Sequence, residues 1–219
     1  MSATFIEQLR AELPFQFRPY GLAGTEAGLV IANASNMPRG ADGGPPASSA
    51  SVATSDEAIA HMAQVAQGFI KRRSPVLAFV DARPTGLGAA ETQLALRWLE
   101  DDPDVTILRK DCVNGFVGAI EAVHHGMHGT SRNRVVDWVN AHRLKTMLVT
   151  GLGTDACVMD FVLTMLSARN HGLMPTLQDI VVLAPATATY GLVGEPAHHL
   201  GLYLMASRGA LLAGELTGV

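Results

Sequence analysis

The sequence predicts an α/β protein with a mostly parallel central sheet. Short runs of β-branched residues and leucine recur along the chain, and each run is almost continuously apolar, as in strands that are buried on both faces. Helical patterns lie between the runs, and this alternation is typical of a parallel sheet covered by helices. The chain has 219 residues, 48% hydrophobic and 16% charged, and we expect one globular domain spanning 1–219.

Five segments have the strand pattern, and all are short enough to favour strands over buried helices. The sequence predicts them at 28–32, 76–80, 105–108, 146–150 and 179–184. Four segments have helical periodicity, and we expect helices at 55–73, 89–100, 131–143 and 154–172. Ser55 is the expected N-cap of the first, which has acids in its first turn and bases in its last. Gly172 is placed to end the fourth.

Residues 1–27 are expected to be an N-terminal extension of the domain. Segment 34–55 is rich in Gly, Pro, Ala and Ser, which predicts a flexible loop or a functional lid. A second loop is expected at 81–88. The histidines between 124 and 128 are interspersed with glycines that disfavour a helix, so we expect a polar loop there and not a metal site.

Charge and composition limit the classes of partner. A net charge of −4 and a pI near 6.0 give no reason to expect nucleic-acid binding. No apolar stretch is long enough to cross a bilayer, and the first residues lack a signal-peptide centre, which predicts no membrane association and a cytoplasmic protein. Sparse charge favours a homo-oligomer. Two cysteines, Cys112 and Cys157, fit a reducing compartment and lack the spacing of a structural zinc site.

The stretch Gly151-Leu-Gly153, between a strand and a helix, has two interpretations. It matches a relaxed dinucleotide-binding fingerprint, with a phosphate at the helix N-terminus. However, it comes late in the chain, and the strand after it does not end in the acid that would bind a ribose. Alternatively, the turn presents Cys157 in the first helical turn, with Thr154 or Asp155 as the N-cap. Unpaired N–H groups and the helix dipole would then lower the thiol pKa. A buried cysteine with no chemical role is the third possibility.

Two segments resemble the signature segments of the isochorismatase-like cysteine hydrolases. They are "GLGTDACVMDFVLTMLSARNHG" (151–172) and "RKDCVNGFVGAIE" (109–121), and they are most similar to the plant-type nicotinamidases. Shorter similar stretches extend the resemblance over most of the chain after about residue 28: "GLVIANASN", "PVLAFVDA", "LRWLEDDP", "VVDWVN" and "HHLGLYLMASRGA".

The resemblance implies a three-layer α/β/α fold and an Asp-Lys-Cys triad that hydrolyses an amide through a thioester. Cys157 matches the nucleophile and Lys110 the triad lysine. The family also has a cis peptide that would fall at Leu152-Gly153, with the N–H groups of Gly153 and Cys157 as the oxyanion hole. We expect the substrate to contact three further residues in the similar segments: Asp81, Asn114 and Phe116.

Two departures from the family pattern concern the chemistry. Asn33 stands where the triad acid should end the first strand, and an amide cannot take a proton from a thiol. Asp81 matches the acid of the metal-binding Asp-x-His pair, but Arg83 stands in place of the histidine and the histidine-bearing segment after it is missing. We therefore expect no metal or other cofactor. In the family the metal helps to bind a pyridine nitrogen, so nicotinamide is a doubtful substrate. His198-His199 have no partner at ligand spacing and are interpreted as structural.

Three functional hypotheses remain open. The first is a divergent cysteine amidohydrolase that acts on a small amide without metal. Cys157 attacks, Lys110 stabilises the anionic state and Asn33 orients substrate or water. The second is a catalytically impaired relative that binds a small ligand or a partner protein. The third is the nucleotide-binding protein.

Overall fold

The computed structural model describes residues 3–34, 49–82, 96–125, 128–189 and 194–218. Its centre is a seven-stranded sheet in the order β1-β9-β8-β7-β2-β3-β4, and every neighbouring pair is parallel. The strands are β1 (Arg18–Gly21), β2 (Ala27–Ile31), β3 (Val76–Asp81), β4 (Val105–Lys110), β7 (Thr146–Leu152), β8 (Asp179–Ala188) and β9 (Leu211–Thr217).

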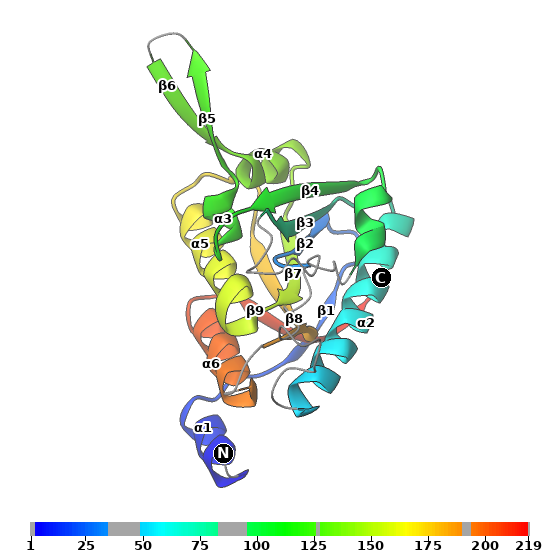
Figure 1. Cartoon of the computed structure of the whole chain (residues 1–219), viewed down its shortest axis with the longest axis vertical. Helices are drawn as coiled ribbons and strands as arrows, with labels where there is room; N and C mark the ends of the chain where they lie inside the picture. Colours follow the sequence, from blue (N-terminus) through cyan, green and yellow to red (C-terminus); the bar gives the residue numbers. More distant parts are fainter. Residues whose placement is uncertain (1–2, 35–48, 83–95, 126–127, 190–193, 219) are drawn as a thin grey trace, which may run out of the picture.

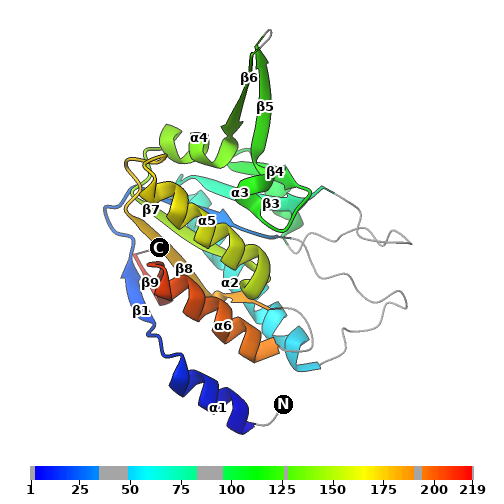
Figure 2. The same cartoon turned by 90° about the vertical axis from the view of Figure 1, so that its left-hand side faces the viewer.

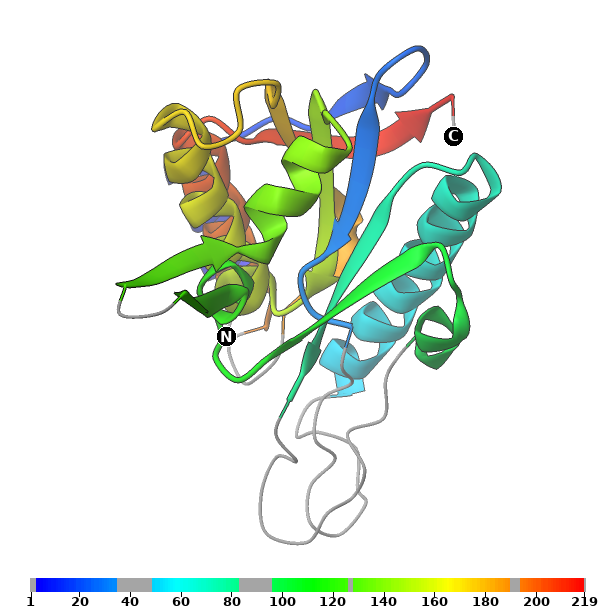
Figure 3. The same ribbon diagram turned by 90° about the horizontal axis from the view of Figure 1, so that it is seen from above.

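Helices cover both faces of the sheet, which gives the three layers that the family resemblance implies (Figures 1 and 3). One face packs against α2 (Ser49–Lys71), and the other against α4 (Arg134–Ala141), α5 (Met159–Asn170) and α6 (Gly194–Ser207). Each face has its own apolar core, and β2, β3 and β7 contribute alternate side chains to the two. The predicted α/β fold with a mostly parallel sheet is therefore confirmed.

The five predicted strands match β2, β3, β4, β7 and β8, and β8 continues four residues past the predicted end at Ala184. Among the described helices, no segment is both long and apolar enough to cross a membrane.

Four local features of the structure are absent from the sequence predictions. Residues 18–21, within the N-terminal extension, form β1, an edge strand that pairs with β9 and that was not predicted. The part of 34–55 from Ser49 onward is helical, so Ser55 lies inside α2 and is not its N-cap; 35–48 lie outside the described residues. Of the helix expected at 89–100, residues 89–95 lie outside the described residues, and Arg97–Asp101 form a 3₁₀ helix, η1.

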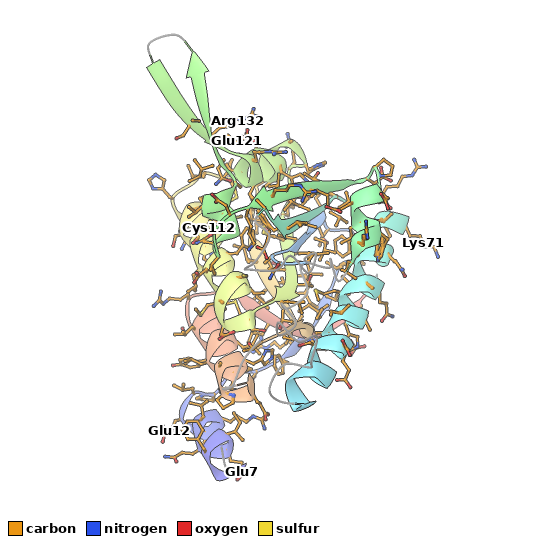
Figure 4. The ribbon with its side chains drawn as sticks, in the orientation of Figure 1. Glu7, Glu12, Lys71, Cys112, Glu121 and Arg132 are labelled. Carbon is orange, nitrogen blue, oxygen red and sulfur yellow. The ribbon has the colours of Figure 1, made fainter. Side chains whose placement is uncertain are left out.

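The fourth concerns the region expected to be a polar loop and the start of a helix. It forms an antiparallel hairpin, β5 (Ile120–His125) and β6 (His128–Asn133), and α4 begins only at Arg134. The hairpin stands away from the sheet (Figures 1 and 2). Glu121 and Arg132 pair at its root, where both are labelled (Figure 4).

The N-terminal segment is anchored on α6. Helix α1 (Ala3–Glu12) lies beside α6 (Figure 2), and Arg10 pairs with Glu195. The Nε2 of His199 lies 2.9 Å from the carbonyl oxygen of Leu13, and its ring packs on Phe15. His199 thus has a structural contact, in agreement with the sequence interpretation.

Helix α6 also packs closely on the turn after β7, at Gly201. A Cβ at position 201 would lie 2.9 Å from the carbonyl oxygen of Thr154 and 3.1 Å from the Cα of Asp155. Both are backbone atoms, which cannot rotate away as the end of a flexible side chain can. The absence of a side chain at Gly201 therefore permits this contact between α6 and the turn that contains Cys157.

We predict that Gly201→Ala destabilises the protein. In an unhindered helix the change would stabilise by up to about 1 kcal/mol, but overpacking against backbone costs about 1–3 kcal/mol. We expect a net loss on the order of 1 kcal/mol in the free energy of unfolding, measured by urea denaturation. The matched control is Leu200→Ala, at the adjacent exposed position of α6. A Gly201→Ala protein at least as stable as wild type would contradict the prediction.

Candidate active site

Four of the predicted site residues come from the carboxyl ends of four adjacent parallel strands. Asn33 follows β2, Asp81 ends β3, Lys110 ends β4, and Cys157 follows β7. Backbone hydrogen bonds continue the sheet past these ends: the Ala34 N–H donates to Phe79 (3.1 Å) and the Leu152 N–H to Asn33 (3.1 Å). Parallel strands place their carboxyl ends at one edge, which is where α/β proteins bind ligands.

Lys110 is the most buried charged residue of this edge, with only 2% of its surface exposed. Its Nζ donates to Asp81 Oδ1 at 2.7 Å and to the Cys112 carbonyl oxygen at 3.2 Å, and it lies 3.8 Å from Cys157 Sγ. An ammonium group has three N–H donors, and each has an acceptor here. The structure therefore brings Lys110 and Cys157 together, as the resemblance implies, and fixes the direction of the ammonium group.

A short helix packs against the side chain of Lys110. Helix α3 (Gly115–Gly118) packs so closely on β4 that a Cβ at Gly118 would lie 2.7 Å from the Lys110 Cβ. The side chain of Asn114 caps this helix, because its Oδ1 accepts from the N–H groups of Phe116 (3.0 Å) and Val117 (3.3 Å). Cys112 lies beside the same helix (Figure 4).

Asn114 and Phe116, both expected to contact substrate, have structural contacts. Asn114 Nδ2 donates to Thr164 Oγ1 at 2.9 Å and to the Asp160 carbonyl oxygen at 3.3 Å, so both ends of this amide link α3 to α5. The half-buried ring of Phe116 packs against the apolar core. These contacts give both residues a role in positioning α3, and no contact described here requires a substrate.

Cys157 lies in a π-helical turn, Thr154–Val158, that precedes α5. Gly153 occupies the N-cap position with a φ of 82°, a conformation that favours glycine. The expected N-cap, Thr154 or Asp155, is therefore wrong by one or two residues. The Val158 N–H donates to the Gly153 carbonyl at 3.0 Å, a bond one residue longer than in an α-helix.

The electrostatics of the thiol differ from the sequence expectation of a lowered pKa. Burial raises the pKa of Cys157 above the ordinary value of a cysteine, because the thiolate loses water. Lys110 lowers the pKa, but the carboxylates of Asp81 and Asp160 raise it. The ion pair between Lys110 and Asp81 thus cancels part of the cation's effect on the thiol.

Of the two glycines before Cys157, Gly151 allows close packing, and the N–H of Gly153 already has an acceptor. A Cβ at Gly151 would lie 2.9 Å from the backbone nitrogen of Asn33. The Gly153 N–H donates to the Ala188 carbonyl at 2.7 Å, so a role of Gly153 in an oxyanion hole would require this bond to break. The cis peptide expected at Leu152-Gly153 is a wrong prediction, since the described residues contain no cis peptide bond.

A second polar cluster supports the turn from behind. His198 Nδ1 lies 2.9 Å from Thr154 Oγ1, and Thr189 Oγ1 donates to Asp155 Oδ1 at 2.9 Å. Burial lowers the pKa of His198, which favours the neutral form of the ring. Sequence reasoning missed these contacts and also the pairing of Asp81 with Lys110. The pairing of Asp81 with Lys110 had a signal in the sequence, because the consecutive strands β3 and β4 end in opposite charges.

Comparison with known proteins gives one curated relative. The chain is 38% identical to nicotinamidase 1 of Arabidopsis thaliana over 182 residues, which are 71% of this chain and 72% of that protein. The chain belongs to the nicotinamidase family. This family of hydrolases is the one that the sequence motifs indicate, although no family model matches the chain.

Solved structures agree in fold with this member of the nicotinamidase family. The nicotinamidase of Staphylococcus aureus superimposes with a TM-score of 0.59 at 16% identity, covering 86% of this chain and 99% of that one. The N-carbamoylsarcosine amidase of Thermoplasma acidophilum gives 0.58 at 17% identity, covering 88% and 99%.

The residues of this chain do not fit the metal site that the family resemblance implies. Within the described ranges, no three His, Cys, Asp or Glu side chains lie close enough together to hold an ion. Asp81, which matches the family's metal-binding acid, pairs instead with an ammonium group. A cation at that carboxylate replaces the metal's charge but offers no coordination site, and we derive no step through a metal.

We predict that alkylation of Cys157 has a midpoint at higher pH than that of an ordinary thiol. Reaction requires the thiolate, which forms only as the pH approaches the raised pKa. Lys110→Met should shift the midpoint further upward, because the cation that lowers this pKa is lost. The measurement is iodoacetamide labelling against pH, read by mass spectrometry.

The control is Arg109→Met, which removes the exposed cation next to Lys110 on β4 and should leave the midpoint unchanged. A Cys157 midpoint below that of a free cysteine in wild type would contradict the account of burial.

Proposed function

We propose that this protein hydrolyses the C–N bond of a small amide through a thioester on Cys157, without a metal. One observation carries the proposal: Lys110 Nζ lies 3.8 Å from Cys157 Sγ at the ligand-binding edge of a parallel sheet, in a chain of the nicotinamidase family. A buried lysine that contacts a cysteine has a direct electrostatic effect on the thiolate. The relative's name supplies the reaction class, amide hydrolysis.

The proposed reaction has two steps. Cys157 Sγ attacks the carbonyl carbon, the C–N bond breaks, ammonia leaves and a thioester forms. Water then attacks the thioester, which releases the carboxylic acid and the thiol. The ammonium of Lys110 stabilises negative charge that develops next to Sγ, and the Cys157 N–H is the proposed oxyanion donor.

Asn33 is proposed to orient the substrate or the attacking water. It is 5% exposed, its carbonyl oxygen accepts the Leu152 N–H of β7, and the N–H of the next residue, Ala34, donates to β3, so the backbone here is fixed on both sides. An amide both donates and accepts hydrogen bonds but takes no proton. This chemistry supports a positioning role at Asn33 and leaves proton transfer to another group.

A catalytically impaired ligand-binding protein is the second candidate, favoured by the raised thiol pKa and by the loss of the acid at Asn33. Loss of general-base catalysis alone typically costs about 10²–10⁴ in rate, which leaves a slow enzyme and not an inert one. The homo-oligomer and the cytoplasmic location stay predictions from the sequence.

The test is ammonia release from a panel of small amides, including nicotinamide, pyrazinamide, N-carbamoylsarcosine and aliphatic amides. We expect at least one amide to be hydrolysed, with a loss of at least about 10³-fold in Cys157→Ala because the nucleophile is removed. Cys112→Ala is the control, since it removes the other thiol and keeps the backbone carbonyl that Lys110 contacts.

No ammonia from any amide, combined with saturable binding of one of them in calorimetry, would favour the impaired ligand-binding protein. Equal hydrolysis by wild type and Cys157→Ala would overturn the thioester route.

A further inference from the structure

The proposed reaction requires a group that holds a proton between its steps, and Asn33 cannot do so. In the first step the thiol proton must leave Sγ and reach the departing nitrogen. In the second, a proton from water must reach Sγ as the thioester breaks. A carboxylate within reach of the Lys110 and Cys157 pair meets both needs.

Asp81 is such a carboxylate. Its Oδ1 lies 2.7 Å from Lys110 Nζ, which in turn lies 3.8 Å from Cys157 Sγ. The three side chains come from β3, from β4 and from the turn after β7, so the contact series crosses the carboxyl edge of the sheet. The carboxylates of both Asp81 and Asp160 raise the pKa of the Cys157 thiol, but of the two only Asp81 accepts a hydrogen bond from the Lys110 ammonium, at 2.7 Å.

We infer that Asp81 is the proton-holding partner of Cys157 and acts through Lys110, a task that the family resemblance assigns to the position of Asn33. This inference rests on the proposed amide hydrolysis. Asp81 is a positioning residue in this scheme, because Lys110 and not Asp81 contacts the reacting sulfur.

A proton passes from Cys157 through Lys110 to Asp81 and later returns, with no net gain or loss. Lys110 Nζ gives a proton to Asp81 Oδ1 and takes one from Cys157 Sγ, leaving a carboxylic acid, an ammonium and a thiolate. After the thiolate attacks, Asp81 returns its proton, again through Nζ, to the departing nitrogen, which leaves as ammonia. In the second step the carboxylate receives a proton from the attacking water, and this proton returns to Sγ as the C–S bond breaks.

The geometry distinguishes this role from that of an ordinary surface ion pair. The Asp81 side chain is 28% exposed and Lys110 is 2% exposed, so water and ions screen the pair only in part. Arg109, the exposed residue next to Lys110 on β4, pairs with Glu100 of η1 at 2.9 Å, and the Glu100 side chain is also 28% exposed. Glu100→Gln is therefore a matched control for Asp81→Asn. Each substitution removes the negative charge of a carboxylate that pairs with a cation of β4, and the two carboxylate side chains are equally exposed.

The experiment measures two properties of Asp81→Asn, Glu100→Gln and wild type: kcat/KM for the amide that wild type hydrolyses, and the pH midpoint of Cys157 alkylation. We expect hydrolysis by Asp81→Asn to fall about 10²–10⁴-fold, while its labelling midpoint moves to lower pH. The midpoint falls because a negative charge near the thiol is gone, yet the released proton has no acceptor. Glu100→Gln should match wild type in both.

Opposite changes in the two properties distinguish proton transfer from structural support. Hydrolysis by Asp81→Asn within about threefold of Glu100→Gln would overturn the inference, and so would a loss of hydrolysis with an unchanged midpoint. If Asp81→Asn does not fold, Asp81→Ser removes the same charge with a smaller side chain and has the same two readouts. A wild-type protein that hydrolyses no amide overturns the proposed function itself, and the inference with it, before any variant is compared.

Discussion

The ammonium group of Lys110 lies where almost no water reaches it, and a buried charge is tolerated only when acceptors surround it. Asp81, the carbonyl oxygen of Cys112 and the sulfur of Cys157 supply these acceptors from three segments of the chain. The chain must therefore bend after β4 so that the Cys112 carbonyl faces Nζ. Helix α3 must lie against β4, which Gly118 allows. The arrangement of this edge of the sheet depends on satisfying one cation.

The central strands were predictable from composition because they are buried on both faces and have few polar residues. The edge strand β1, with sequence RPYG, is mostly exposed, so its pairing with β9 has no hydrophobic signal. The β5–β6 hairpin has no continuous apolar run, and β6 in particular reads HGTSRN, so its antiparallel pairing has no hydrophobic signal in the sequence. The π-helical turn before α5 depends on Gly153 and on α6 packing above it, and hydrophobic periodicity cannot predict either feature.

The site also has features that local sequence predicts and features that depend on tertiary structure. Cys157 and Lys110 were predictable because they stand within motifs whose neighbours are also retained. Asp81 was assigned to substrate binding by its place in a family segment, but its ion pair with Lys110 depends on β3 and β4 being neighbours in register, with Asp81 opposite Lys110. The opposite charges at the two strand ends are visible in the sequence, but the order and register of the strands, which bring the charges together, are tertiary properties. A fold shared with amidases at 16–17% identity is compatible with a changed set of charges at one edge.

The order of strands in the sheet also bears on how the protein folds. Strand β2 pairs with β7 along its whole length, from Ala27 opposite Thr146 to Ile31 opposite Thr150, and this contact joins distant parts of the chain. Contacts of such high sequence separation close large loops and form slowly. In the sequence, Asn33, Asp81 and Lys110 lie between β2 and β7, and Cys157 follows β7. The sulfur therefore meets the ammonium only once the centre of the sheet has formed, so the contact between Lys110 and Cys157 depends on the global fold.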